Sequence, residues 1–298
     1  MEEPMLHKTR GMLTRALTLA AVLLTACLLP SSADAESTYE RIVREGTIRV
    51  GIYNEVPVGY IDENGRVTGE TPEVLRVALA GIGDIEMEPF VVDEFGALIP
   101  GLLAGRFDVI AAGLYITPER CETIAYTRPT IKYGETLVVR EGNAFEIHSY
   151  DDVAQHPEAV IAVAPGSVEA KYARAAGIPD DRIRMLAVSQ IGVAALRSGQ
   201  VDVLAVPAVT GQKMVESAVD GDIELVDPFI DPVFEGKVAI NYAGMGLRQE
   251  DTDLLTALNA QLDEFLDTVG HLELVSEFGF AEAQLPDGKT AEEVCSGN

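Results

Sequence analysis

Basic side chains are scarce in this chain of 298 residues. It has 22 Lys and Arg against 48 Asp and Glu, which gives a formal net charge of −26 at pH 7. Such an acidic surface repels the phosphates of nucleic acids and of anionic lipids, so we expect neither to be a partner. The acidity has two readings, ordinary solubility or adaptation to high salt, in which screening tolerates the self-repulsion.

Long apolar runs are absent after the first 35 residues. The one such run covers residues 16–29, follows three basic residues, and precedes the small-residue cleavage pattern Ala33-Asp34-Ala35. We therefore expect residues 1–35 to be a signal peptide and the mature chain to be a soluble, periplasmic monomer without a membrane span. The alternative is a lipobox that ends in Cys27, which would carry a lipid after cleavage.

Cysteine is also rare, because only Cys121 and Cys295 occur after residue 35. In an exported protein an even pair is expected to form a disulfide, here one that ties the C-terminal tail to the first lobe. Two unpaired buried thiols are the alternative, since separation in sequence does not give distance in space. Neither Cys has a His or Cys at metal-ligand spacing, and the chain has no nucleophile motif. We therefore expect no metal site, no cofactor and no enzymatic activity.

The sequence does contain a phrase that occurs twice. Segment 102–111 reads LLAGRFDVIA, and segment 196–205, 94 positions later, reads LRSGQVDVLA. Each copy has the pattern of the end of an amphipathic helix, a Gly that ends it, and an Asp that opens a buried strand, as in a βαβ unit. We therefore predict an α/β fold with two similar lobes and a ligand cleft between them.

The periodicity of apolar residues predicts the other elements. We expect a helix over 72–80 with Thr71 as its N-cap, and a last helix from Leu254 that Gly270 ends. Lobe 1 is expected at 36–141 and 238–298 and lobe 2 at 142–237, so that two crossings form a hinge. Further helices are predicted over 39–45, 95–104, 168–176, 191–198 and 211–217, and strands over 47–53, 85–91, 136–139, 160–164, 184–188, 201–206 and 237–245.

The loop after the first copy of the phrase has the residues of an anion receptor. Thr117 suits a helix N-cap, Pro118 the first helical position, and Arg120 lies in the first turn. Free N–H groups, a hydroxyl and a guanidinium together suit a carboxylate. The alternative is that Arg120 only forms surface ion pairs with neighbouring glutamates. The turn at 165–167 lies at the equivalent edge of the second lobe and is expected to supply further N–H donors.

Five sequence motifs occur in an order that is typical of one protein family. They are GIYNEVPVG at 51–59, LIPGL at 98–102, the repeated Gly-x-x-Asp strand, TPER at 117–120 and the Gly-Ser turn at 166–167. Together they resemble the family 3 extracellular solute-binding proteins of ABC importers, which have the type II periplasmic binding protein-like fold. The resemblance covers essentially all of the chain after residue 35. It implies a membrane permease as partner and a second lobe that closes over the ligand.

The same resemblance implies roles for individual residues. Arg120 would grip the carboxylate of the ligand, with Gly113, Thr117 and Ser167 assisting. The amino-acid binders of the family usually carry an Asp shortly after the second repeat, which pairs with the α-ammonium. This chain has Val206-Pro207-Ala208 there, so a free α-amino group would lack its usual counter-charge.

Segments 54–57, 95–102, 118–121 and 290–295 are most similar to the ectoine and hydroxyectoine-binding members. By that likeness Arg120 binds the carboxylate and Glu55 the delocalised cation. Phe95 and Tyr115 would form an aromatic cage around this cation. Val58 stands where a third aromatic residue of the cage is expected, and Tyr53 or Tyr60 is the candidate to replace it. Without the family likeness, the cage aromatics read as ordinary core side chains. The predicted ligand-binding set also includes Gly166, Val168 and Thr210.

The favoured function is therefore capture of a small zwitterionic solute, with ectoine or hydroxyectoine as the expected ligand, for an ABC importer. One alternative is a polar amino-acid-binding protein of the same family. A second is an exported enzyme similar to cyclohexadienyl dehydratase, in which Glu55 and Glu70 would serve as acid and base. A third is a sensory ligand-binding module.

Overall fold

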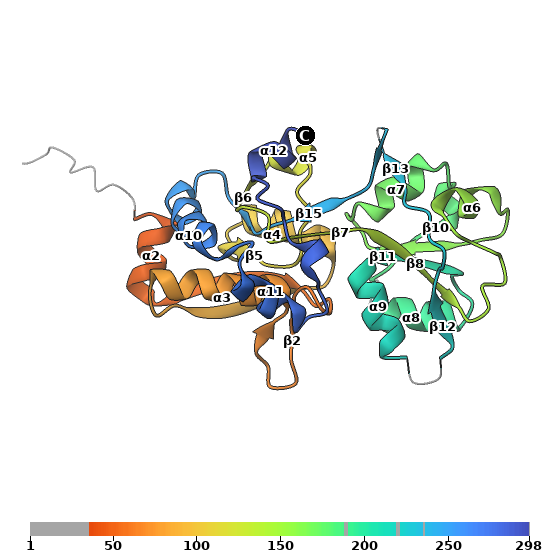
Figure 1. The fold of residues 1–298 in the computed structure, drawn as a ribbon, viewed down its shortest axis with the longest axis horizontal. Coiled ribbons are helices and arrows are strands. Elements are labelled where there is room, and N and C mark those ends of the chain that lie inside the picture. Colours follow the sequence, from red (N-terminus) through yellow and green to blue (C-terminus); the bar gives the residue numbers. More distant parts are fainter. Residues whose placement is uncertain (1–35, 188–189, 219–220, 235, 298) are drawn as a thin grey trace, which may run out of the picture. The chain divides into compact units, whose positions relative to one another are not determined.

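Two five-stranded sheets organise the chain (Figure 1). The computed structural model describes residues 36–187, 190–218, 221–234 and 236–297, and residues 37–298 form one compact unit. The expected signal peptide, with Cys27, lies outside the described residues. The first sheet has the order β4 (Glu86–Val92), β1 (Thr47–Tyr53), β5 (Val109–Ile110), β16 (Gly246–Leu247) and β6 (Ala125–Tyr126). The second has the order β10 (Ile183–Met185), β9 (Ile161–Val163), β11 (Val203–Pro207), β8 (Glu135–Arg140) and β12 (Ile223–Leu225).

The two sheets have the same plan. In each, the first three strands are parallel, the fourth runs antiparallel to both of its neighbours, and the fifth therefore has the same direction as the first three. The third strand is β5 in one sheet and β11 in the other, and both are the strands of the repeated phrase. The repetition in the sequence therefore corresponds to the central strand of two matching sheets.

The aspartate of each copy holds the neighbouring strand in place. Asp108 Oδ2 accepts from the backbone N–H of Arg49 at 3.0 Å, and Asp202 Oδ2 accepts from that of Val160, also at 3.0 Å. Asp202 pairs with one guanidinium, that of Arg140, at 2.6 Å. The buried Asp108 carboxylate pairs with three, those of Arg41, Arg49 and Arg248.

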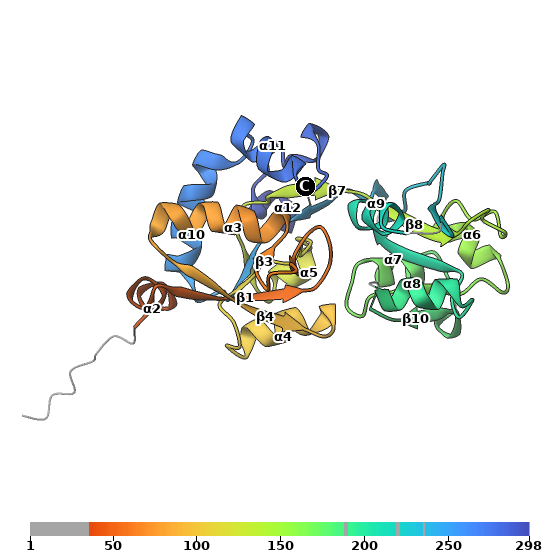
Figure 2. The ribbon, with the colours of Figure 1, turned by 90° about the horizontal axis from the view of Figure 1, so that it is seen from below.

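Helices cover both faces of the first sheet. Figure 2 shows α3 (Glu70–Ile82), α10 (Thr252–Phe265) and α11 (Val269–Ser276) on one side of β1 and β4, and α4 (Leu98–Leu103) on the other. Leucines of α3 and α10 bury against β1, and those of α4 pack with Phe107 in a separate core. The other elements of this half are α2 (Thr38–Glu45), the hairpin β2 (Tyr60–Ile61) and β3 (Val67–Thr68), the 3-10 turns η2 (Phe95–Ala97) and η4 (Glu282–Gln284), α5 (Pro118–Cys121) and α12 (Ala291–Cys295).

On one face of the second sheet, α8 (Gln190–Arg197) contacts β11 and α9 (Ala208–Glu216) contacts β8 and β12, while α6 (Tyr150–Gln155) and α7 (Glu169–Ala175) pack against the other face. Its remaining elements are the 3-10 turn η3 (Asp180–Arg182) and the ribbon β13 (Val233–Phe234) with β14 (Lys237–Val238). No helix among the described residues has the length and apolar character that crossing a membrane requires.

Two segments connect the sheets. β7 (Ile131–Tyr133) leads to β8, and β15 (Asn241–Ala243) pairs with β7 on the way back (Figure 1). Because β8 belongs to the second sheet, we propose that the first crossing lies at Gly134 and not at residue 141. An apolar strand fits either sheet, so its sequence did not show to which one it belongs.

Three local predictions were wrong. α3 begins at Glu70 with Gly69 as N-cap, because the Thr71 hydroxyl donates to Glu70 and accepts from Gly113 N–H instead of capping. α10 ends at Phe265, and Gly270 lies inside α11. Apolar spacing continues through the break, so it did not reveal two helices. The strand expected over 237–245 is divided between β14 and β15, and β16 begins just after it.

Candidate functional site

One cavity collects most of the residues that the sequence singled out. Its volume is about 30 Å³, room for no more than a few water molecules. Eight of the eleven predicted residues line it, namely Glu55, Val58, Phe95, Gly113, Tyr115, Arg120, Ser167 and Val168. Thr117, Gly166 and Thr210 do not line it but contact residues that do.

Arg120 is the basic side chain of this cavity, and its position follows from local sequence. Thr117 caps α5 by accepting from Arg120 N–H at 3.3 Å, and Pro118 takes the first helical position, as predicted. Arg120 as a whole residue is only 8% exposed. Its Nη1 donates to Tyr115 O at 2.8 Å, and it lies 5.6 Å from the centre of the Phe95 ring. The predicted alternative, in which Arg120 forms only surface ion pairs, does not describe this buried position.

Two of the hydrogen bonds that cross from one half of the chain to the other involve the basic and acidic side chains of this cavity. Arg120 Nη2 donates to Gly166 O at 3.0 Å, and Thr210 Oγ1 donates to Glu55 at 2.9 Å. The backbones also meet closely, since a Cβ on Gly166 would lie 2.7 Å from Gly96 Cα. Only glycine fits this approach, and Gly166 has φ +77°.

Glu55 is the predicted cation-binding residue. Burial raises the pKa of Glu55 to about 7, against the opposing effect of the Thr210 hydrogen bond. The negative charge of Glu169 raises it further. Glu55 also borders a larger hollow of about 1230 Å³, which opens between β1 and β4 on one side and α8 and α9 on the other. This carboxyl therefore lies where the small cavity meets a wider groove.

Tyr133 supplies an aromatic face that the sequence did not assign. The rings of Tyr115 and Tyr133 are 5.0 Å apart, and both line the cavity. A Cβ on Gly113 would lie 2.9 Å from the Tyr133 hydroxyl and 3.0 Å from Val58 Cβ, so these two side chains are neighbours at one wall. Neither Tyr53 nor Tyr60, the expected replacements for the missing aromatic, lines this cavity.

Two acidic side chains at the site were also missed. Glu169 lines the cavity, and Glu135 is close enough to share a hydrogen bond with it. The only local hint was the place of Glu169 two residues after Ser167. Pro207 lines the cavity at the position where an Asp is usual for amino-acid binders. Glu70, the second carboxyl of the enzyme alternative, is not among the lining residues.

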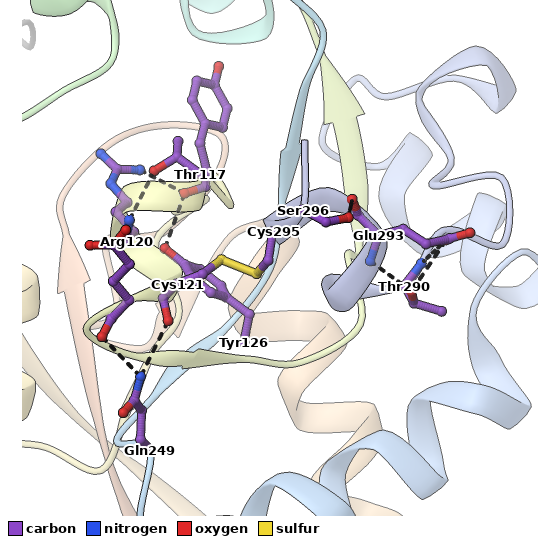
Figure 3. Close-up of a disulfide and its surroundings, with 11 residues drawn as sticks. Thr117, Arg120, Cys121, Tyr126, Gln249, Thr290, Glu293, Cys295 and Ser296 are labelled. Atoms are coloured by element: carbon purple, nitrogen blue, oxygen red, sulfur yellow. Dashed lines mark hydrogen bonds between the residues drawn. A yellow bond between two sulfur atoms is a disulfide. The ribbon is translucent and has the colours of Figure 1, made fainter. Parts of the chain in front are cut away.

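The two cysteines after residue 35 are joined by a disulfide. The Cα atoms of Cys121 and Cys295 are 5.8 Å apart, and the bond links α5 to α12 (Figure 3). Figure 3 shows Arg120 on a different side of the same short helix. Gln249 donates to the backbone oxygens of Cys121 and Glu122 and so holds the end of α5 from a second direction.

Residues 48–275 match the family described as bacterial extracellular solute-binding proteins, family 3. Over 263 residues the chain is 37% identical to the probable amino-acid ABC transporter periplasmic-binding protein y4tE of Sinorhizobium fredii, which covers 87% of this chain and 86% of that protein. It is 25% identical over 268 residues to the glutamate-binding protein GluB of Corynebacterium glutamicum, covering 85% and 84%.

Solved structures show the same architecture. The chain is similar to EhuB in complex with hydroxyectoine, with a TM-score of 0.80 and 31% identity over 88% of this chain and 99% of that chain. Its likeness to the P235GK mutant of ArgBP from T. maritima, with a TM-score of 0.68 and 24% identity over 81% of this chain and 98% of that chain, concerns the fold alone. These structures confirm the predicted type II fold of two α/β lobes.

Proposed function

This chain belongs to family 3 of the bacterial extracellular solute-binding proteins, and on that premise we propose that it captures a small zwitterion outside the cytoplasm and delivers it to the permease of an ABC importer. The observation that carries this proposal is that a guanidinium and a carboxyl group line the same cavity. Arg120 suits a carboxylate, and Glu55 lines the same cavity. A solute with one anionic and one cationic end matches both groups.

Within this class we propose ectoine or hydroxyectoine as the solute. Both carry a carboxylate and a delocalised cation on a compact ring. Phe95, Tyr115 and Tyr133 offer aromatic faces to such a cation, and Tyr133 offsets the missing aromatic at Val58. The similarity to EhuB in complex with hydroxyectoine supports the same ligand. An amino acid is the alternative, in line with the name of the Sinorhizobium relative.

Binding requires the cavity to widen. A solute of this kind needs more room than about 30 Å³. The contacts that must yield are the hydrogen bonds Arg120–Gly166 and Thr210–Glu55, together with the ion pair between Lys171 and Glu119. We propose that the halves separate about the β7 and β15 connections, admit the solute from the groove at Glu55, and close again.

Titration calorimetry with ectoine and hydroxyectoine tests this proposal. Saturable binding is expected in the wild type and its loss in Arg120→Ala, because a buried charge-assisted contact is removed. Arg174→Ala is the matched control, since Arg174 pairs with Asp180 at an exposed site and should bind normally. Unchanged binding in Arg120→Ala would show that Arg120 does not hold the carboxylate. No binding of either solute would exclude the ectoines as ligands.

A further inference from the structure

Glu135 and Glu169 form a pair of carboxyl groups beside the cavity. Glu135 is the first residue of β8 and Glu169 the first of α7, and their side chains are 3% and 4% exposed. Burial of two neighbouring carboxyls is unfavourable when both are charged. The charges of these two carboxyl groups therefore do not stabilise the folded state.

Their hydrogen bonding is incomplete. Glu135 Oε1 accepts from Asn241 Nδ2 at 2.7 Å, and Asn241 Oδ1 accepts from Tyr172 at 3.0 Å. Among the described residues, Glu135 Oε2 and the Tyr115 hydroxyl have no hydrogen-bond partner. Tyr115 is 4% exposed, lines the cavity with Glu169, and lies close enough to Glu135 to lower the pKa of that carboxyl. A buried hydroxyl at the cavity wall, that of Tyr115, and a buried carboxyl just behind it, that of Glu135, thus lie close to each other.

The charges around the pair favour a proton between them. Burial, and then the charge of Glu169, raise the pKa of Glu135 well above its usual range. Burial also raises the pKa of Glu169, although Ser167 and Arg120 act in the opposite direction. Both shifts favour a proton retained by the pair. The ionisable groups that face it are Glu55, Tyr115, Arg120, Tyr133, Tyr150 and Tyr172.

We propose that the Glu135–Glu169 pair is a subsite for a cationic group with N–H donors on the solute. This inference rests on the proposed function, in which Arg120 holds the carboxylate of the same solute. When the cation binds, the shared proton leaves the pair for the solvent, and N–H donors take the free carboxylate oxygens. Net charge at the wall is conserved, because one positive group replaces one proton.

The geometry selects the type of cation. A quaternary ammonium has no N–H, so it leaves the buried acceptors unpaired, which is unfavourable. An ammonium or amidinium satisfies them. The described side chains nowhere gather three potential metal ligands of the His, Cys, Asp and Glu type, so a metal ion is not the cation we assign here. The pair also provides the counter-charge that Pro207 cannot supply.

Calorimetry with matched probes tests the subsite. We would titrate ectoine, L-proline and proline betaine at pH 7 in two buffers of different ionisation enthalpy. Ectoine and L-proline carry N–H, whereas proline betaine has the proline ring with two N-methyl groups. L-Proline should bind more tightly than proline betaine, and a bound N–H solute should release about one proton.

Variants identify the source of the proton. Glu135→Gln and Glu169→Gln should each reduce proton release to the part that comes from Glu55 and weaken N–H solutes about tenfold to a hundredfold. If one variant fails to fold, the other provides the measurement. Glu70→Gln, which changes a buried carboxyl away from the cavity, should keep wild-type affinity and proton release.

Three outcomes would overturn the inference. The first is an Arg120-dependent N–H solute that releases no proton, and the second is proline betaine bound as tightly as L-proline. Either leaves the proposed function intact. The third is no binding of any of the three probes, which overturns the inference together with the proposed function for these zwitterions.

Discussion

Replacing Glu70 by glutamine is expected to stabilise the protein above pH 7 and to have little effect near pH 5. Glu70 is fully buried, and its Oε2 accepts from the Thr71 hydroxyl at 2.7 Å. Its Oε1 has no hydrogen-bond partner within the described part of the chain. Burial raises the pKa of Glu70 from an ordinary 4.5 to about 7, although Thr71 and Thr130 act against it.

The sign follows from where the proton binds. Between pH 4.5 and 7 the folded state holds the Glu70 proton and the unfolded state does not, so this contribution to stability falls as pH rises. The full effect is about 3 kcal/mol, and about 2.5 kcal/mol of it lies between pH 5 and pH 8.5. Glutamine does not titrate, so the variant lacks this loss.

Urea unfolding of both proteins at pH 5 and pH 8.5, at constant ionic strength, measures the effect. The difference in unfolding free energy between Glu70→Gln and wild type should rise by about 2.5 kcal/mol from the lower to the higher pH. Other titrating groups occur in both proteins and cancel. Glu88→Gln, at an exposed side chain, is the control. A difference that is equal at both pH values would refute the reasoning.

Two further predictions concern stability. The bond between Cys121 and Cys295 closes a loop with a sequence separation of 174, so the double Cys→Ser variant should lose about 2–5 kcal/mol of unfolding free energy. Reductant should destabilise the wild type and leave that variant unchanged, and equal sensitivity of both would contradict the prediction. Asp108→Asn should cost about 3–5 kcal/mol, because it removes the charge of a buried carboxylate that pairs with three arginines. Asp202→Asn, with one guanidinium partner, should cost less in denaturant unfolding, and the reverse order would contradict the assignment.

Much of the fold could be predicted because local sequence and tertiary position agree. The repeated phrase identified two lobes, since each copy is the central strand of its sheet. The spacing of apolar residues located β1 to the residue. The same spacing predicted one helix where the structure has two, because apolar residues continue at helical spacing across the break between α10 and α11. The repeated phrase also did not show to which of the two sheets β8 belongs, because strand pairing depends on residues far away in sequence.

The candidate site could be predicted where its residues belong to a local motif. Thr117 and Arg120 lie in a strand–turn–helix segment, whose cap and guanidinium are legible in the sequence. Glu135, Glu169 and Tyr133 have no such motif. Tyr133 ends β7 and lines the cavity, whereas Glu135 begins β8 and lies beside it, and the two strands pair with different and distant parts of the chain. The spacing of residues in the sequence does not show which distant residues come together at the cavity.

The close approach of Gly96 and Gly166 has a consequence for the range of solutes. The two halves meet there main chain against main chain, with no side chain that could change its rotamer. Their smallest separation is therefore set by backbone thickness, whatever occupies the cavity. Further closure therefore cannot tighten the contacts around a small solute. The scaffold itself sets a lower limit on the size of solute that the closed cavity can hold tightly. A single methyl group at residue 96, whose Cβ would lie 3.1 Å from Pro165 O, would move that limit outward.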